Sequence, residues 1–257
     1  MAVENLPLLH RIAIITGGRR GIGKAIAIAM ANAGADIAVC DYVNENGDLD
    51  AVGTEIKKLG RKAYTGIADV SKKTDIDGFV NKVVKELGTV DILVNNAVSG
   101  GGNLLQITEA QWQASTDVNL TGPLLFCQTV SKIMIEHKKG VIINMASIEG
   151  IVRNPYPRQG TAYGIHKAGL IMLTKGLAWD LAPHNIRINA IAPGLVETDL
   201  TKYLWTNPEF MKILVPMSPL GRMAKPEEIA NVAVFLASDA SSYITGQTII
   251  ADGGLIT

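Results

Sequence analysis

The sequence predicts an α/β fold, a single doubly wound sheet of about seven mostly parallel strands with helices on both faces. Short apolar runs alternate with helical patterns almost from end to end of the 257 residues. The composition agrees, because aromatic residues make up only 5% of the chain while Ala, Ile, Val and Gly are plentiful. Such a mixture suits buried parallel strands packed against helices with small contact faces. No linker rich in Pro, Gly or Ser divides the chain, so residues 1–257 are predicted to form one domain.

The first half of the chain supplies four strands and the helices between them. Short runs rich in β-branched residues predict strands at 11–16, 36–41, 63–68 and 90–95. Apolar residues at helical spacing follow the first three strands and predict helices at 22–33, 48–59 and 72–87. A Gly-rich loop follows the fourth strand. This order of strand and helix is typical of consecutive βαβ units.

The second half continues the alternation, with two irregular interruptions. Helical patterns cover about 109–136, and are followed by a strand at 140–147, a helix at 162–181, a strand at 186–191, a helix at 226–237 and a strand at 248–251. The least regular segments, about 149–160 and 195–220, are rich in Pro or Gly. Both follow strands, and ligands of doubly wound sheets bind beyond the carboxyl ends of strands. These segments are therefore predicted to contact the substrate.

Charge and apolar patterning exclude several kinds of partner. The formal net charge is zero, so we expect no nucleic-acid or anionic-membrane partner. No apolar run approaches the roughly 18 residues of a membrane span, and the first residues lack the pattern of a signal peptide. Cys40 and Cys127 show neither CxxC pairing nor metal-ligand spacing. We expect a cytoplasmic protein with reduced, buried thiols and no metal site.

A glycine-rich turn follows the first strand and opens the first helix. It runs Thr16-Gly17-Gly18-Arg19-Arg20-Gly21-Ile22-Gly23. Glycine allows a tight turn, a close approach of backbone to a pyrophosphate and close packing of helix on sheet. The phosphates would lie at the helix N-terminus, where free N–H groups and the helix dipole favour anions. The alternative is a turn that merely contains glycines, but its place between strand and helix favours a Rossmann-type nucleotide site.

Asp41 ends the second strand and bears on the choice of cofactor. A carboxylate there can accept hydrogen bonds from the ribose hydroxyls and would repel a 2′-phosphate. Its alternative role is to cap the segment that follows. Arg19 and Arg20 favour the opposite choice, because either guanidinium could reach a 2′-phosphate. NAD is the predicted cofactor, since the acid stands where the added phosphate would lie, and NADP is the alternative.

Tyr163 and Lys167 form a second chemical motif, on the helix predicted from residue 162. Their i, i+4 spacing places both side chains on one helix face. An ammonium beside a phenol favours the phenolate and lowers the tyrosine pKa from about 10. Tyr163 could then act as the base when an alcohol is oxidised, or as the acid when a ketone is reduced. The alternative is an exposed pair without chemistry.

Together these motifs resemble the short-chain dehydrogenase/reductase family, in its small-subunit branch. The resemblance runs from about Arg11 to Gly254, essentially the whole chain. Further motifs stand after the predicted strands in the order that the family has. They are Asp69-Val70, Asn95-Asn96-Ala97, Asn119 in Asp-Val-Asn-Leu-Thr-Gly, Ser147, and the run from Pro193-Gly194 through Val196 to Thr198.

The resemblance implies a role for each matching residue. In the catalytic set, Ser147 would bind the substrate oxygen, Tyr163 would exchange the proton, and Lys167 would bind the nicotinamide ribose and lower the tyrosine pKa. Asn119 would order a water in a proton path to Lys167. The implied cofactor contacts are Gly17, Arg19, Arg20, Gly21, Ile22, Gly23, Asp41, Asp69, Val70, Asn95, Ala97, Tyr163, Lys167, Pro193, Gly194, Val196 and Thr198. The plain alternatives are a strand end for Ser147, a helix cap or kink for Asn119 and an N-cap for Thr198.

Two departures from the family pattern stand out. Val98 follows Asn95-Asn96-Ala97 where the family has glycine, which could narrow the cofactor site or demand another backbone angle. The interval from Ser147 to Tyr163 is about three residues longer than usual, with the extra length in 153–160. After Thr198, apolar residues at helical intervals suggest either a mobile lid with an apolar wall or a helix buried against the body. Glu149, Arg153, Arg158 and His166 are candidates to bind a hydroxyl-rich or anionic substrate.

The leading hypothesis is an oxidoreductase that transfers a hydride between a nicotinamide cofactor and a secondary alcohol or ketone, such as a sugar or cyclic alcohol. An NADPH-dependent 3-oxoacyl reductase is the alternative enzyme, and a non-catalytic nucleotide sensor or scaffold is the alternative of another class. A homo-oligomer, with a tetramer favoured, is expected from the apolar stretches 124–126 and 170–173 and from the family resemblance.

Overall fold

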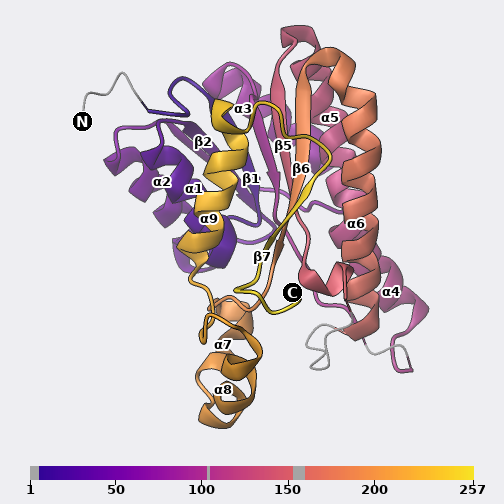
Figure 1. Ribbon diagram of the computed structural model, residues 1–257. Helices are drawn as coiled ribbons and strands as arrows, with labels where there is room; N and C mark the ends of the chain where they lie inside the picture. The colour runs from indigo at the N-terminus through magenta and orange to yellow at the C-terminus, as the bar shows by residue number, and fades with distance from the viewer. Residues whose placement is uncertain (1–5, 103–104, 153–159) are drawn as a thin grey trace.

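The computed structural model describes residues 6–102, 105–152 and 160–257 (Figure 1). A seven-stranded sheet lies at its centre, with the order β3-β2-β1-β4-β5-β6-β7 and every neighbouring pair parallel. The strands are β1 (Ile12–Thr16), β2 (Asp36–Asp41), β3 (Ala63–Ile67), β4 (Ile92–Asn95), β5 (Gly140–Met145), β6 (Ile186–Pro193) and β7 (Thr248–Ala251). The predicted fold class is confirmed.

Helices cover both faces of the sheet and bury two separate apolar cores. On one face lie α1 (Gly21–Asn32), α2 (Asp48–Lys58) and α9 (Pro226–Ala237). On the other lie α3 (Lys73–Leu87), α5 (Gly122–His137) and α6 (Gly160–Leu181). Every residue of β1, β4 and β5 is buried, because these central strands are covered on both sides. This explains why the strands are continuous apolar runs rather than alternating ones.

The order of the strands reverses between β1 and β4, which places a crevice at their carboxyl ends. The two strand ends are tied by hydrogen bonds. The Thr16 hydroxyl oxygen accepts the backbone N–H groups of Asn96 (2.9 Å) and Ala97 (3.0 Å). The Asn96 amide donates to the carbonyls of Thr16 and Gly17, both at 2.9 Å. The glycine-rich turn is therefore held in place by the loop after β4.

The structure divides the predicted helical stretch 109–136 into three parts. These are α4 (Glu109–Thr116), a π-helical turn (Asp117–Thr121) and α5. Gly122 begins α5 where a Cβ atom would lie 2.6 Å from the Val70 carbonyl oxygen, so the helix packs closely on the segment after β3. Within the described residues, none of the helices has both the length and the apolar character that a membrane span requires.

The segment after Thr198 forms two short helices beyond the carboxyl edge of the sheet, α7 (Lys202–Trp205) and α8 (Pro208–Leu214) (Figure 1). The expectation of a helix buried against the body holds for part of this segment, and the mobile lid stays a prediction. Leu204 and Leu214 are buried in a small apolar cluster with Leu195 and Met223, whereas Leu200 is half exposed toward the cleft described below. In the other predicted substrate segment, residues 153–159, with Arg153 and Arg158, lie outside the described part of the chain.

Candidate active site

Two adjoining cavities lie at the carboxyl edge of the sheet. The larger, about 700 Å³, extends from the glycine-rich turn past Asp41 to Asp69 and Val70. The smaller, about 130 Å³, brings together Ser147, Tyr163 and Lys167. Their linings share Ile22, Asn96, Val98, Thr198 and Leu200. The two cavities therefore form one cleft. Asp41, Asp69 and Val70 line one end of it, and Tyr163 and Lys167 line the other.

The glycine-rich turn has the backbone geometry expected of a phosphate site. Gly17 and Gly21 have positive φ angles of 63° and 56°, which side chains other than glycine rarely adopt. A Cβ atom on Gly23 would lie 2.3 Å from the Gly17 carbonyl oxygen, so the first turn of α1 needs glycine for close packing. No side chain caps the N-terminus of α1, and its first turn contains no acidic residue. The larger cavity thus fits the pyrophosphate of a dinucleotide.

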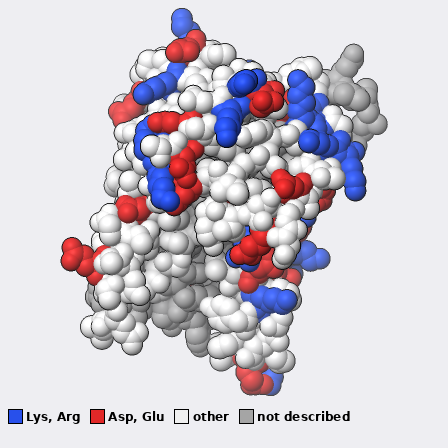
Figure 2. Space-filling model, turned by 180° about the vertical axis from the view of Figure 1, so that it is seen from behind, with Lys and Arg blue, Asp and Glu red and all other residues white. Residues whose placement is uncertain are grey.

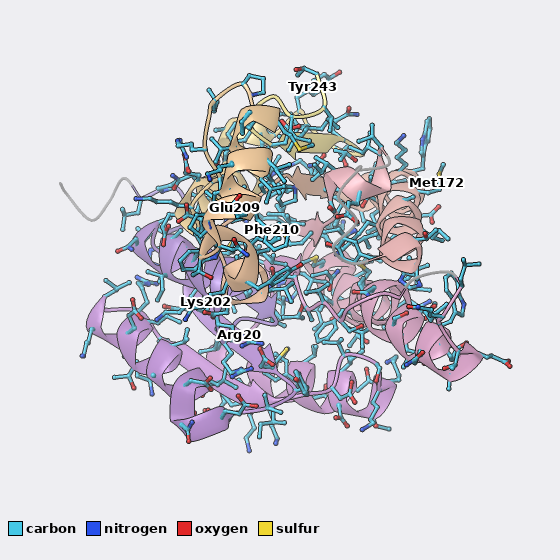
Figure 3. All side chains as sticks on the ribbon, turned by 90° about the horizontal axis from the view of Figure 1, so that it is seen from below. Arg20, Met172, Lys202, Glu209, Phe210 and Tyr243 are labelled. Atoms are coloured by element: carbon cyan, nitrogen blue, oxygen red, sulfur yellow. The ribbon has the colours of Figure 1, made fainter. Side chains whose placement is uncertain are left out.

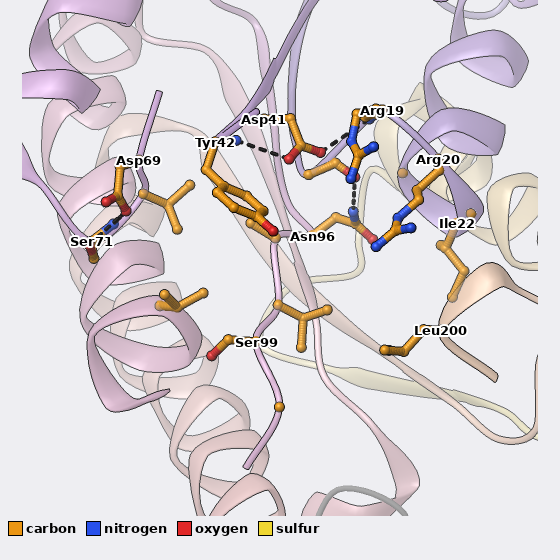
Figure 4. Close-up of a pocket in the computed structure, with 18 of the residues that line it drawn as sticks. Arg19, Arg20, Ile22, Asp41, Tyr42, Asp69, Ser71, Asn96, Ser99 and Leu200 are labelled. Carbon is orange, nitrogen blue, oxygen red and sulfur yellow. Dashed lines mark hydrogen bonds between the residues drawn. The ribbon is translucent and has the colours of Figure 1, made fainter. Parts of the chain in front are cut away.

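Asp41 lies at the end of β2 and is buried against the turn (Figure 4). Its carboxylate accepts the backbone N–H groups of Tyr42 (2.9 Å) and Arg19 (3.4 Å). Burial raises the pKa of Asp41, and those N–H groups and the Arg19 charge oppose the shift. A carboxylate so placed can accept further hydrogen bonds from ribose hydroxyls.

Arg19 and Arg20 differ in what their side chains do. The Arg19 side chain is only 5% exposed, and its guanidinium bonds Asp48 (2.6 Å) and Glu45 (3.1 Å). Arg20 is exposed and lines the larger cavity, with its side chain directed into it (Figure 4). The sequence could not separate these adjacent arginines, because their difference depends on carboxylates more than 20 residues away.

Asp69 and Val70, which were predicted to contact the adenine, line the larger cavity. The Asp69 carboxylate accepts the hydroxyl (2.6 Å) and backbone N–H (3.0 Å) of Ser71 and pairs with Lys72. Burial alone would raise the pKa of Asp69, but these interactions hold it below its usual value. Tyr42 and Ser71 also line the cavity. Neither was predicted from the sequence, although each directly follows a predicted cofactor residue.

The Asn95-Asn96-Ala97-Val98 segment presents different residues to the cleft than expected. Asn95 is buried, and its amide donates to Asn144 (2.9 Å) and to the Cys127 sulfur (3.4 Å). It lines neither cavity, whereas Asn96 lines both and Ala97 lines the larger. Val98 lines both cavities without a positive φ angle. The valine therefore occupies space in the cleft but does not strain the backbone.

Two glycines bring Ser147 to the helix that carries Tyr163 and Lys167. Ser147 follows β5 and caps a 3₁₀ turn (Ile148–Gly150), where its hydroxyl accepts the Glu149 backbone N–H at 3.2 Å. A Cβ atom on Gly150 would lie 2.6 Å from the Lys167 carbonyl carbon. One on Gly164 would lie 2.8 Å from the Glu149 carbonyl oxygen. This close packing places Ser147, Tyr163 and Lys167 around the smaller cavity.

Lys167 is a buried cation beside a phenol. It is 3% exposed, and its Nζ donates to the Met145 carbonyl at 2.5 Å. The same nitrogen lies 5.4 Å from the centre of the Tyr163 ring. Burial lowers the pKa of Lys167 from 10.5 to about 8. The ammonium that is present below this pH favours the phenolate form of Tyr163.

Asn119 lies in the π-helical turn, behind the cleft rather than on its surface. Its amide donates to the carbonyls of Ser115 (2.9 Å) and Ser99 (3.1 Å), and its oxygen accepts the Ser99 backbone N–H at 3.1 Å. Ser99 lines the larger cavity. The side chain of Asn119 thus fixes the loop after β4, and this loop shapes the cofactor end of the cleft. A π-helical turn within a longer helix often marks a functional site.

His166 was a candidate to bind the substrate, but it lines neither cavity of the cleft. It is 1% exposed, lies against the Trp112 ring with centroids 4.9 Å apart, and meets the Thr116 hydroxyl at 3.0 Å. Burial, together with the Lys167 charge, lowers its pKa. His166 packs against two residues of α4 and does not line the smaller cavity.

The segment after β6 contributes residues to the lining of both cavities. Pro193, Gly194, Val196 and Thr198 line the smaller cavity, and Thr198 also lines the larger. The Thr198 hydroxyl accepts the Thr201 backbone N–H at 3.3 Å, so this residue is an N-cap as well as a lining residue. Within residues 6–102, 105–152 and 160–257, no group of three or more His, Cys, Asp or Glu side chains is placed to hold a metal ion.

A cleft for a dinucleotide that ends at a Ser–Tyr–Lys set defines the class of protein: an oxidoreductase that acts on CH–OH or ketone groups with a nicotinamide cofactor. The chain belongs to the short-chain dehydrogenase/reductase family, and a family model described as enoyl-(acyl carrier protein) reductase matches residues 17–256.

Known proteins resemble the chain over its whole length. The 3-oxoacyl-[acyl-carrier-protein] reductase FabG of Thermotoga maritima is 42% identical over 248 residues, 96% of this chain and 98% of the relative. A crystal structure of a short-chain type dehydrogenase/reductase from Mycobacterium marinum has a TM-score of 0.91 and 36% identity over 99% of both chains. The 7α-hydroxysteroid dehydrogenase complexed with NADH and 7-oxo glycochenodeoxycholic acid has a TM-score of 0.91 and 34% identity, over 99% of this chain and 97% of that chain.

Proposed function

We propose that the protein is an NAD(H)-dependent dehydrogenase or reductase of a secondary alcohol or ketone. One observation carries the proposal: Ser147, Tyr163 and Lys167 line one small cavity, and this cavity opens into a larger one that ends on Asp41. The cofactor supplies the hydride chemistry when it is bound. The protein's part is to place the reacting carbon beside the cofactor and to move one proton.

Ser147, Tyr163 and Lys167 divide that work. Ser147 donates a hydrogen bond that orients the substrate oxygen. Tyr163 removes the hydroxyl proton when an alcohol is oxidised and returns it when a ketone is reduced. Lys167, held by the Met145 carbonyl, favours the phenolate form of Tyr163 and binds the ribose next to the nicotinamide. Asn119 supports the site from behind, through Ser99.

NAD rather than NADP is the proposed cofactor. The Asp41 carboxylate lines the cavity at the ribose end, where it accepts hydroxyl hydrogen bonds and repels a 2′-phosphate. The bonds from Arg19 to Asp48 and Glu45 weaken the main argument for NADP, since this guanidinium is already paired. The related 7α-hydroxysteroid dehydrogenase was solved with NADH.

The substrate is proposed to be a compact alcohol or ketone, such as a sugar or cyclic alcohol. The smaller cavity holds about 130 Å³ and is lined by Glu149, Leu200 and Val98 as well as by the catalytic set. Segments 149–160 and 195–220 are proposed to complete its walls. A 3-oxoacyl thioester is the second candidate, and the observation that favours it is the name shared by the FabG relatives.

We also propose one cytoplasmic domain that assembles into a homotetramer, with neither a nucleic-acid nor a membrane partner. Ile165, Met172 and Trp179 form an exposed apolar stripe on α6, 49%, 66% and 85% exposed, with Met172 at the periphery in Figure 3. Phe126, in the apolar stretch 124–126, is fully buried in the monomer and contributes nothing to such a surface. On the face in Figure 2 basic side chains gather at the upper right and are interspersed with acidic ones elsewhere, so the proposal of no nucleic-acid partner rests on the formal net charge of zero.

The test is a substrate panel with a tyrosine variant. Purified protein is assayed with NAD⁺ and NADP⁺ against sugars, cyclic alcohols and 3-hydroxyacyl thioesters, beside Tyr163→Phe. We expect a compact alcohol to reduce NAD⁺, and Tyr163→Phe to lower kcat by at least about a hundredfold while NAD⁺ binding is retained. If no substrate gives a rate that Tyr163→Phe abolishes, although NAD⁺ binds, the protein is a nucleotide sensor. A preference for thioesters would instead support the 3-oxoacyl reductase.

A further inference from the structure

An ion-pair cluster around the buried Arg19 side chain adjoins the ribose end of the cleft and has no part in the proton chemistry. Its centre is the Arg19 guanidinium, whose Nη1 bonds Asp48 Oδ2 at 2.6 Å and Glu45 Oε2 at 3.1 Å. Arg19 lines the same cavity as Asp41, and its backbone N–H donates to the Asp41 carboxylate. The cluster therefore lies beside the carboxylate that selects the cofactor.

The chain after β2 folds back in a way that brings the two carboxylates to Arg19. Asn46 and Gly47 both have positive φ angles, 52° and 75°, within the 3₁₀ turn Glu45–Gly47. This turn leads directly into α2, so that Asp48 stands at the first position of the helix. An acidic residue is favourable there whether or not Arg19 is near, because of the helix dipole. The hydrogen bond from Arg19 therefore comes in addition to the favourable interaction of Asp48 with the helix dipole.

The guanidinium retains unused hydrogen-bonding capacity. Arg19 Nε is buried without a hydrogen-bond partner among the described residues, and so is Asp48 Oδ1. A cation that is 5% exposed and incompletely bonded would gain from an additional anion. The guanidinium bonds the carboxylates of Glu45 and Asp48, and the Asp41 carboxylate accepts the backbone N–H of the same residue. The cluster therefore has an excess of negative charge, which repels a phosphate. Removal of one carboxylate would give the guanidinium more free bonding capacity and would reduce the negative charge that repels a phosphate.

We propose that Asp48 is a positioning residue which, with Glu45, holds Arg19 against α2 and so withholds it from a 2′-phosphate. Asp48 is then a second determinant of cofactor choice that acts with Asp41. The inference rests on the NAD preference proposed above. It explains why an arginine in the glycine-rich turn, which would otherwise favour NADP, is compatible with an NAD site.

The test measures the dissociation constants of NAD⁺ and NADP⁺ for the full chain by calorimetry, without any substrate. The variants are Asp41→Ser, Asp41→Ser with Asp48→Asn, and Asp41→Ser with Asp50→Asn. Asp50 is the matched control, because it is also an acidic residue in the first turn of α2 but bonds Asn44 and Thr65 instead of Arg19. We expect Asp48→Asn to improve the NADP⁺/NAD⁺ affinity ratio of Asp41→Ser by at least about tenfold, and Asp50→Asn by less than about threefold.

Further variants show whether Arg19 causes the change. Adding Arg19→Gln to the Asp41→Ser/Asp48→Asn variant should remove the gain. If Asp48→Asn unfolds the protein, as seen in the thermal melt, Glu45→Gln replaces it, because Glu45 bonds the same nitrogen from a more exposed position. Equal effects of Asp48→Asn and Asp50→Asn, or a gain that survives Arg19→Gln, would overturn the inference. A parent protein that prefers NADP⁺ would refute the proposed cofactor, whereas the comparison of Asp48 with Asp50 tests the positioning role separately.

Discussion

Replacement of Lys167 by methionine is expected to abolish activity and yet stabilise the fold at neutral pH. The lysine is 3% exposed, and its burial lowers its pKa from 10.5 to about 8. Since one pKa unit corresponds to about 1.4 kcal/mol, keeping this ammonium in the interior destabilises the folded state by about 3 kcal/mol at pH 7. The hydrogen bond to the Met145 carbonyl, worth about 1–2 kcal/mol, is lost in the variant. The net gain for Lys167→Met at pH 7 is therefore about 1–2 kcal/mol.

The pH dependence of this gain is the sharper measurement. The folded-state pKa of Lys167 lies below the unfolded one, so between about pH 8 and 10.5 the unfolded chain binds more protons. The stability of the parent protein relative to the variant therefore rises as the pH rises through this window. Between pH 7 and pH 9.5 the advantage of Lys167→Met should fall by about 2 kcal/mol.

Urea unfolding at the two pH values measures the difference directly. Lys175→Met is the control, because Lys175 is an exposed lysine on the same helix and its replacement should give no comparable pH-dependent difference. Activity with the best alcohol substrate provides a second readout, which should be lost only in Lys167→Met. If the stability difference between Lys167→Met and the parent protein is the same at both pH values, the argument from burial is wrong.

The remaining predictions concern the glycine-rich turn, the π-helical turn and the thiols. Gly23→Ala should weaken NAD⁺ binding at least about tenfold in a titration, since its Cβ would collide with the Gly17 carbonyl, whereas Gly78→Ala meets nothing within 4 Å and should be neutral. Asn119→Ala should lower the free energy of unfolding by about 2–3 kcal/mol in urea, because it leaves buried backbone groups unpaired. Burial raises the pKa of both thiols, that of Cys127 to about 12, so a thiol reagent should react with neither in the native protein at pH 8 and with both after denaturation.

Each of these predictions has an outcome that would contradict it. Unchanged NAD⁺ affinity in Gly23→Ala would show that the turn can shift away from the added methyl group. An Asn119→Ala variant as stable as the parent would mean that water replaces the amide without loss. Rapid labelling of native protein would place Cys40 or Cys127 nearer to solvent than the structure does.

The strand and helix order could be predicted from the sequence because it is encoded locally. Buried parallel strands require short apolar runs, helices require apolar residues at helical spacing, and Gly17, Gly21 and Gly23 mark a turn that only glycine allows. Predicted boundaries differ from the observed ones by one or two residues in most elements, and β2, β7 and α9 match in full. The π-helical turn between α4 and α5 was not predicted, because its hydrogen-bond pattern leaves no mark in the apolar spacing.

The direction of individual polar side chains was decided by the tertiary structure. Asn95 and Asn96 are adjacent and chemically identical, yet one bonds Asn144 in the interior and the other supports the glycine-rich turn. His166 was a substrate candidate by proximity in the sequence, but the geometry of α6 turns it onto Trp112. Each outcome depends on a partner that lies far away in the chain.

The sequence alone therefore determined the fold and the order of the motifs, because glycine geometry and apolar periodicity act over a few residues. The class of chemistry followed from the spacing of Tyr163 and Lys167 and from the family resemblance. Only the tertiary structure decided that Asp48 and Glu45 pair with Arg19 while Arg20 stays in the cavity. It alone showed that Gly150 and Gly164 bring Ser147 against α6. Long-range contacts of this kind arise when the sheet packs against its helices, and the free energy of that packing is a property of the whole chain.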